Sequence, residues 1–176
     1  TDIDPFPPRP ILHVDFGEGG NSGPCQRDGW YVDEPGFTWI GGRPATLVLS
    51  PPHGSNDRLV RIVATPFVAE QSLSKQRVAI SVDGAAIGTA ILRNEALIEF
   101  MLPRSKRSDS DLLQIALECP DARRPLDVIP GQHDDRVLGI AVHSIEICEF
   151  GDPGDRDSAI QQHDDGVQPS IDREID

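Results

Sequence analysis

Aromatic residues gather in one stretch of this chain, GWYVDEPGFTWIGGRPATLVL at residues 29–49. Both tryptophans of the protein, Trp30 and Trp39, lie there, and Tyr31, its one tyrosine, follows the first. Aromatic rings stack on the apolar C–H faces of sugars, while neighbouring Asp, Asn, Gln or Arg side chains bond the hydroxyl groups. The same rings also fill hydrophobic cores. The stretch therefore indicates either a platform for a flat ligand or part of a core.

We predict the burial of the two tryptophans separately. Glu34-Pro35-Gly36 is typical of a turn, after which Trp39 enters a strand on the same face as Phe37. Two large rings on one face are more typical of a core than of a surface, so we expect Trp39 to be buried. The position of Trp30 stays open between core and surface. Aromatic residues make up 5% of the chain, and this low fraction favours core packing over a stacking platform.

Sequence patterns of catalytic and metal sites are missing. The five histidines lie outside any recognisable acid–base motif, and G-x-S-x-G, H-E-x-x-H and C-x-x-C are absent. We therefore expect no catalytic residue, no metal ligand and no cofactor. One glycine-rich loop, GEGGNSG at 17–23, carries Glu18, Asn21 and Ser22, whose oxygens suit Ca²⁺. A plain connecting loop is the favoured interpretation, with a structural Ca²⁺ as the alternative.

The charge of the chain bears on its partners. There are 29 acidic and 16 basic residues, which give a formal net charge of -13. Such a surface repels phosphate backbones and anionic lipid headgroups, so we expect no nucleic-acid binding and no binding to membrane surfaces. No apolar run approaches the roughly 20 residues of a membrane-spanning helix, which argues against membrane insertion.

The three cysteines, Cys25, Cys119 and Cys148, are few and widely spaced. This spacing does not indicate a disulfide framework or a zinc site, so we expect free thiols. Free thiols favour a cytoplasmic location. The alternative is a bridge between Cys119 and Cys148 in an exported protein.

Apolar residues alternate with polar ones through most of the chain, which is the period of a β-strand with one buried face. We expect strands within residues 11–17, 45–51, 58–67, 76–82, 85–92, 96–103, 112–119 and 138–150. The residues expected to face the core are Leu12, Val14, Phe16, Ala45, Leu47, Leu49, Val60, Ile62, Ala64, Val78, Ile80, Val82, Ala96, Ile98, Phe100, Leu102, Leu113, Ile115, Leu117, Cys119, Ile140, Val142, Ile145 and Ile147.

Two local features refine these strands. Asp83-Gly84 predicts a two-residue hairpin, because both central residues of a type I′ turn need a positive φ. In the last strand the apolar phase shifts by one residue near His143-Ser144. A β-bulge is the usual cause of such a shift.

The chain divides into three segments. Residues 1–10 contain four prolines and are predicted to be an extended linker. Residues 151–176 hold eight acidic and two basic residues and are predicted to be a flexible acidic tail. The domain at 11–150 has eight or nine expected strands and no expected helix of ten or more residues. We therefore predict an all-β fold, an antiparallel two-sheet β-sandwich of jelly-roll type, with an immunoglobulin-like sandwich as the alternative.

Some of these residues form a pattern that resembles a known type of module. The pattern consists of Gly29-Trp30, Glu34, Phe37-Thr38-Trp39, Gly42, Ala45, Leu47, Leu49, Leu117, Pro120, Asp121-Ala122, Pro125 and the run from Asp135 to Ile145. It resembles the β-sandwich accessory domain found beside bacterial glycosyltransferases and other cell-surface polysaccharide enzymes. The resemblance covers residues 12–148 and implies a jelly-roll domain similar to carbohydrate-binding modules, within a larger protein. The pattern contains no catalytic motif and specifies no ligand.

The sequence thus predicts a non-catalytic accessory module of a larger bacterial glycan-related enzyme, with carbohydrate binding as its function. The alternative is protein interaction, as a spacer packed against a neighbouring domain or through self-association. For a sugar site we predict Trp30, Tyr31, Glu34 and Arg61 as the ligand-binding residues. An exposed ring in a polar groove would favour the sugar site, and a large apolar patch on one sheet would favour protein interaction.

Overall fold

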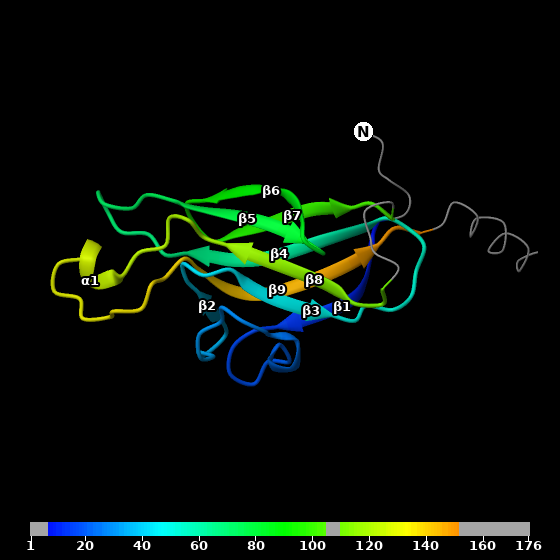
Figure 1. Ribbon diagram of the computed structural model, residues 1–176, viewed down its shortest axis with the longest axis horizontal. Coiled ribbons are helices and arrows are strands. Elements are labelled where there is room, and N and C mark those ends of the chain that lie inside the picture. The colour runs from blue at the N-terminus through cyan, green and yellow to red at the C-terminus, as the bar shows by residue number, and fades with distance from the viewer. Residues whose placement is uncertain (1–6, 105–109, 152–176) are drawn as a thin grey trace, which may run out of the picture.

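In the computed structural model, residues 7–104 and 110–151 are described, and they form two antiparallel β-sheets packed face to face (Figure 1). The strands are β1 Arg9–Asp15, β2 Thr38–Ile40, β3 Ala45–Leu49, β4 Arg58–Pro66, β5 Gln76–Val82, β6 Ala85–Leu92, β7 Ala96–Leu102, β8 Leu113–Glu118 and β9 Ile140–Glu149. Helical structure in this part of the chain is limited to one turn, α1 Pro125–Val128, and a 3₁₀ turn at Gly23–Cys25. The predicted antiparallel jelly-roll sandwich of eight or nine strands is confirmed, with nine strands.

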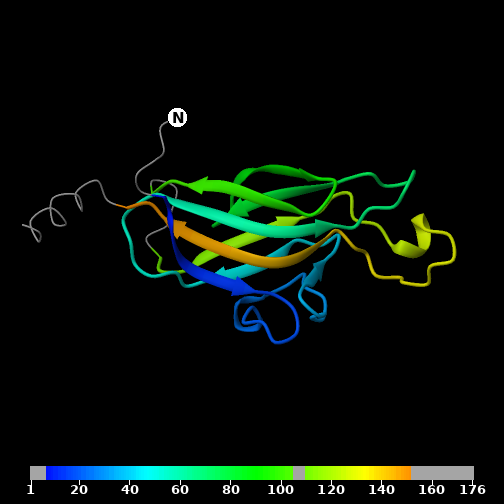
Figure 2. The same cartoon turned by 180° about the vertical axis from the view of Figure 1, so that it is seen from behind.

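Each sheet has a simple strand order. The five-stranded sheet runs β1-β9-β4-β7, and β2 also pairs with β9. The four-stranded sheet runs β3-β8-β5-β6. In Figure 2 the blue β1, orange β9, teal β4 and green β7 lie side by side, and no coloured segment crosses in front of them. We call this uncovered side the outer face of the five-stranded sheet.

The core between the sheets is built by the alternating apolar residues that the sequence indicates. All the expected inward positions of β3, β4, β5 and β9 are buried, and so are Leu113, Ile115, Leu117 and Cys119 in and just after β8. Leu12, Ala96 and Phe100 are partly buried against the same cluster. Because each fully buried Leu or Ile side chain contributes about 1.5–3 kcal/mol, this core is the main source of stability.

The two predicted local features are both present. Asp83 and Gly84 have φ angles of 48° and 80°, as the hairpin between β5 and β6 requires. In the pairing of β4 with β9, Val63 lies opposite Ser144 while the next residue, Ala64, lies opposite Val142. His143 is therefore the extra residue of a β-bulge. The bulge lets Val142 and Ile145 both point into the core and turns His143 to the outer face.

Some boundaries differ from those predicted. β1 begins at Arg9, inside the segment 1–10 predicted as a linker. The rest of that linker up to residue 6, and the predicted tail from residue 152, lie outside the described residues.

All three cysteines are free thiols, and Cys119 and Cys148 are not bridged. Among the described residues, no helix has the length and apolar character to cross a membrane.

Candidate functional site

Trp39 lies on the outer face of the five-stranded sheet, so the prediction that it is a core residue was wrong. Thr38 and Ile40 take the two inward positions of β2, and Trp39 between them is partly exposed. The fully buried hydroxyl of Thr38 donates to Asp33 Oδ1 at 2.5 Å and accepts from the Gly17 N–H at 3.2 Å. A hydroxyl with both partners satisfied can be buried at little cost. The polar residue therefore faces inward and the indole faces outward.

Trp39 belongs to a group of rings on this face, which we call the aromatic cluster and define as Phe37, Trp39, Phe67 and His143. The Phe37 and Trp39 centroids are 5.7 Å apart at 79°, and those of Trp39 and Phe67 are 6.4 Å apart at 82°. His143 lies 5.8 Å from Phe37. Such edge-to-face contacts hold the rings in fixed orientations. All four side chains remain partly accessible to solvent.

Hydrogen-bonding groups lie directly beside the aromatic cluster. His143 Nδ1 is 3.2 Å from the Gly36 carbonyl, and Nε2 is 2.8 Å from the Thr65 hydroxyl. Since a carbonyl only accepts, His143 Nδ1 is the donor in its bond to Gly36. The Thr65 hydroxyl is also 3.4 Å from Glu95 Oε2, and the Glu95 side chain is 67% exposed. An imidazole, a hydroxyl and an open carboxylate therefore border the rings.

A row of ionisable side chains crosses the same face, one from each of β1, β9, β4 and β7. Arg61 Nε donates to Glu99 Oε2 at 3.0 Å, and its Nη1 donates to Glu146 Oε1 at 3.4 Å. His13 Nδ1 lies 3.5 Å from the other oxygen of Glu146. Burial acts to raise the pKa of Glu146, but hydrogen bonds from Cys148, Arg61 and His13 bring it below its ordinary value. We call these four residues, His13, Glu146, Arg61 and Glu99, the ion row.

Two of the predicted site residues, Trp30 and Tyr31, lie elsewhere, at the sandwich edge where the chain crosses from β2 to β3. They line a hollow of about 580 Å³ together with Gly29, Gly41, Gly42, Arg43 and Val137, which we call the edge hollow. Trp30 stacks on Phe16 at 4.9 Å and donates from Nε1 to the Thr46 carbonyl at 2.8 Å. The Tyr31 hydroxyl donates to the Val137 carbonyl at 3.0 Å and accepts from the Val137 N–H at 3.1 Å.

The third predicted residue, Glu34, is tied to the edge hollow through an arginine. Glu34 Oε1 accepts from Arg136 Nη1 at 2.7 Å, and the Arg136 guanidinium lies 5.8 Å from the centre of the Tyr31 ring. Arg136 also pairs with Asp134, at 2.7 Å. The hydrogen bonds from Arg136 lower the pKa of Asp134.

The structure thus separates the four predicted residues. Trp30, Tyr31 and Glu34 share the edge hollow and its border, whereas Arg61 stands in the ion row on the outer face of β4. The aromatic cluster was missed because Trp39 was placed in the core, and because Phe67 and His143 are distant from it in sequence. The bulge at His143-Ser144 was a usable signal, since bulges often re-aim a side chain at a site.

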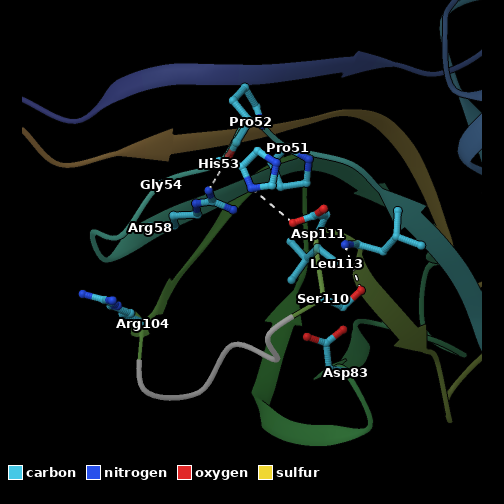
Figure 3. Close-up of a pocket in the computed structure, with 11 residues that line it drawn as sticks. Pro51, Pro52, His53, Gly54, Arg58, Asp83, Arg104, Ser110, Asp111 and Leu113 are labelled. Atoms are coloured by element: carbon cyan, nitrogen blue, oxygen red, sulfur yellow. Dashed lines mark hydrogen bonds and ion pairs between the residues drawn. The ribbon is translucent and has the colours of Figure 1, made fainter.

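A further hollow of about 240 Å³ lies at the other end of the sandwich, among the loops that follow β3 and β7 (Figure 3). The His53 ring points toward Asp111, with Nδ1 3.1 Å from Oδ1, and Arg58 Nη2 donates to the Pro52 carbonyl at 2.6 Å. The side chains of His53 and Asp111 are 86% and 68% exposed. An ion pair this open to water is worth little, and it does not define a catalytic dyad.

The glycine-rich loop at 17–23, for which Ca²⁺ binding was the alternative interpretation, is organised by its own hydrogen bonds. Asn21 Oδ1 accepts from the Asp15 N–H at 2.7 Å, and Asn21 Nδ2 donates to the His13 carbonyl at 3.2 Å. No group of three or more His, Cys, Asp or Glu that could hold a metal occurs within 7–104 and 110–151. A structural Ca²⁺ bound through backbone carbonyls stays the untested alternative.

The fold can be compared with known proteins. No protein-family model matches the chain, and no curated protein sequence is detectably similar to it. Among solved structures, a GH115 4-O-methyl-alpha-glucuronidase, BtGH115A, described as specific for decorated arabinogalactans, matches 86% of this chain with a TM-score of 0.53 and 14% identity. The CBM22-1 xylan-binding domain from Paenibacillus barcinonensis Xyn10C matches 81% with a TM-score of 0.51 and 12% identity. The CBM22-1–GH10 modules of Clostridium thermocellum Xyn10B, complexed with xylohexaose, match 83% with a TM-score of 0.51 and 11% identity.

These likenesses concern the fold. The chain spans 95% of the Paenibacillus domain, but 19% of the glucuronidase and 29% of the Clostridium chain. It therefore has the size of one module within such multidomain enzymes. The β-sandwich described above is the fold of carbohydrate-binding modules.

Proposed function

We propose that this chain is a non-catalytic carbohydrate-binding module of a larger glycan-related enzyme, and that the glycan binds at the aromatic cluster. The observation that carries the proposal is the position of Trp39. Its ring lies partly exposed on an uncovered sheet, held edge-on by Phe37 and Phe67, and Thr65 and Glu95 border the same cluster at His143. An apolar ring bordered by hydrogen-bonding groups matches a sugar, which has apolar C–H faces and hydroxyl edges.

The ion row extends this surface across the sheet. Adjacent strands are about 4.8 Å apart, so a row over four strands spans roughly 14 Å, enough for several sugar units. Arg61 has N–H donors, and Glu99 and Glu146 have acceptor lone pairs, beyond those used in their mutual contacts, so these groups can bond ligand hydroxyls without exchanging those contacts. Because their mutual contacts hold these side chains in place, little entropy would be lost on binding. Arg61 is thus the one predicted site residue that lies on the proposed surface.

The edge hollow is the second, separate surface at which we consider sugar binding. Trp30 and Tyr31 present ring surface there, but the indole N–H, the Tyr31 hydroxyl and the Glu34 carboxylate already bond to groups of the protein. Their hydrogen bonding to a ligand would need these contacts to be exchanged, which costs affinity. The predicted roles of Trp30, Tyr31 and Glu34 stay predictions, as does a cytoplasmic location, and a structural Ca²⁺ stays the alternative to a plain loop.

Protein interaction remains the second candidate, and one observation favours it. Leu97 and Met101 on β7 are 52% and 44% exposed, and they pair across the sheet with Val63 and Leu59 of β4. These apolar pairs flank the Arg61–Glu99 ion pair on the outer face. A neighbouring domain of the parent protein could cover them.

The deciding experiment measures binding of the wild-type protein to a panel of soluble polysaccharides, xylan included, with and without Ca²⁺. We expect binding that Trp39→Ala weakens roughly tenfold or more, the equivalent of about 1.4 kcal/mol. Trp39→Phe should keep part of the affinity, because a smaller ring remains for stacking. Val32→Ala, at a side chain that is 84% exposed, is the matched control.

The comparison with Trp30→Ala separates the two surfaces. Loss of binding in Trp39→Ala with full binding in Trp30→Ala supports the outer face. The reverse pattern would move the site to the edge hollow. If the folded wild-type protein binds none of the glycans, with or without Ca²⁺, the carbohydrate proposal fails and the neighbouring domain becomes the partner to test.

A further inference from the structure

Glu95 places a carboxylate at the border of the aromatic cluster. It lies in the turn between β6 and β7, and its Oε2 atom is 3.4 Å from the Thr65 hydroxyl and 3.9 Å from His143 Nε2. The Glu95 side chain is 67% exposed, whereas the His143 side chain is 29% exposed. The carboxylate therefore stands on the open side of the cluster, and an oligosaccharide that covers the rings would come close to it.

No fixed positive charge neutralises Glu95. Within residues 7–104 and 110–151, neither a lysine nor an arginine makes an ion pair with it, and this includes Arg93 in the same turn. Thr65 is uncharged, and the His143 imidazole carries no charge when it is neutral. Glu95 thus presents a negative charge, without a fixed cation paired to it in this part of the chain, to a ligand bound over the aromatic cluster.

The ion row adds no unshared positive charge to this surface. It crosses β1, β9, β4 and β7, which lie side by side in Figure 2. Its guanidinium, Arg61, is shared between the carboxylates of Glu99 and Glu146, at 3.0 and 3.4 Å. His13 lies between Glu146 and Asp15, at 3.5 and 2.9 Å. One guanidinium against two carboxylates leaves the row with a net charge of -1 when its imidazole is neutral.

We propose that Glu95 determines the specificity of the outer face, by excluding glycans that carry a carboxylate or sulfate group near the aromatic cluster. This role of Glu95 rests on the proposed function, and the ligand class is then a glycan that is neutral where it contacts this surface. A negative group brought within about 4 Å of Glu95 is repelled enough to weaken binding roughly fivefold, even with the dielectric constant of water. A neutral sugar avoids this repulsion, and its hydroxyl can donate to the same carboxylate.

The aromatic cluster alone would not distinguish neutral from acidic glycans. Both kinds of sugar have similar apolar C–H faces, so both can stack on a ring. The overall charge of -13 also repels anionic glycans, but it acts on the whole molecule and is screened by salt. Glu95 differs because its charge lies at the site itself. A test of its role must therefore separate the local charge from the overall charge.

The test compares two derivatives of each soluble polysaccharide in the panel described above, one hydroxyethylated and one carboxymethylated to the same degree. The two substituents are similar in size, so the derivatives differ mainly in charge. Affinities are measured at about pH 8, where histidine side chains are neutral. We expect the wild-type protein to bind the carboxymethyl form at least roughly fivefold more weakly than the hydroxyethyl form. We call this ratio the charge penalty.

Two variants separate the local charge from the overall charge. Glu95→Gln removes the charge at the cluster and keeps the shape of the side chain, and it should reduce the charge penalty to about twofold or less. Glu118→Gln makes the same change in the total charge at an exposed residue of β8, on the four-stranded sheet. It is the matched control and should keep the wild-type charge penalty. Because both side chains are exposed, both variants should fold.

Trp39→Ala distinguishes a failure of this inference from a failure of the proposed function. If the wild-type protein binds no glycan, or if Trp39→Ala binds as the wild type does, the proposed function is wrong and the role of Glu95 is wrong with it. Binding that depends on Trp39 but shows no charge penalty overturns the role of Glu95 alone. So does a charge penalty that Glu118→Gln lowers as much as Glu95→Gln does. A penalty lowered by Glu95→Gln and not by Glu118→Gln supports the proposal.

Discussion

The hydroxyl of Thr38 donates to the Asp33 carboxylate at 2.5 Å inside the sandwich, and this contact determines which face of the sheet Trp39 occupies. β2 has three residues, so once Thr38 faces inward, Ile40 does too and Trp39 faces outward. The Gly17 N–H completes the arrangement by donating to the same hydroxyl. The long loop before β2 is thus fastened to the core by a polar residue.

Thr38→Val tests this relationship. Valine has nearly the same shape but leaves the Gly17 N–H and the Asp33 carboxylate without their buried partner. We expect the free energy of unfolding to fall by about 1–3 kcal/mol, the usual cost of an unsatisfied buried group. Urea unfolding followed by circular dichroism measures it.

The matched control for this change is Thr46→Val, at a partly exposed position on β3. It should change the unfolding free energy by less than about 0.5 kcal/mol. Equal effects of the two substitutions would mean that the Thr38 hydroxyl contributes nothing particular to the fold.

A second prediction concerns the close packing at the edge hollow. A Cβ at Gly41 would lie 2.4 Å from the Val137 carbonyl oxygen and 3.1 Å from the Tyr31 ring. Gly41→Ala must therefore push β2 away from the segment before β9, and we expect a loss of about 1–3 kcal/mol in unfolding free energy. Gly23→Ala, where a Cβ meets nothing within 4 Å, should be neutral or slightly stabilising. A Gly41→Ala protein as stable as the wild type would contradict the packing described here.

The third prediction is a pH dependence that arises from Asp121. Arg77 donates to both carboxylate oxygens, at 2.8 and 2.6 Å, and these bonds lower the pKa of Asp121 to about 2. The unfolded chain has the ordinary value near 3.9. Because the folded value is the lower one, the stabilisation is complete above about pH 5 and is lost as the pH falls through 4 toward 2.

Urea midpoints of the wild type and Asp121→Asn, measured from pH 7 to pH 2, check this expectation. The wild type should be the more stable at pH 7, and the gap should close between about pH 4 and pH 2. Asp127→Asn serves as the control, because its 40% exposed carboxylate pairs with Arg124, the N-cap residue of the same short helix α1. A gap for Asp121→Asn that is constant with pH would mean that the ion pair is not the source of its effect.

The core strands could be predicted from the sequence because a strand with one buried face shows alternating apolar and polar residues. Inward positions such as Val60, Ile62 and Ala64 alternate with outward ones, and even the bulge at His143 appears as a shift in that alternation. Trp39 could not be placed in this way. β2 is three residues long, and its inward face holds a polar residue whose partners come from 5 and 21 positions away.

The candidate site, too, could be predicted only in part from the sequence. The sequence drew attention to the stretch that contains Trp30 and Trp39, but their roles depend on neighbours that only the fold brings near. Phe16 lies against Trp30, and Phe67 lies against Trp39. Arg61 was predicted as a ligand-binding residue, yet its partners Glu99 and Glu146 come from strands that pair with β4 at long range. Spacing along the chain carries no information on such contacts.

The last prediction concerns the fluorescence of two variants that each keep a single tryptophan, which should respond differently to a bound glycan. Trp30→Phe leaves Trp39 as the sole tryptophan, and Trp39→Phe leaves Trp30. If a glycan binds the outer face, its addition should change the emission of Trp30→Phe and leave that of Trp39→Phe unaltered, because the Trp30 ring is stacked on Phe16 away from that face. Phenylalanine at position 30 keeps the stacking but loses the hydrogen bond to the Thr46 carbonyl, at a cost of about 1 kcal/mol, so both variants should fold. A change confined to Trp39→Phe would place the ligand in the edge hollow, and a titration of the responding variant gives its affinity directly.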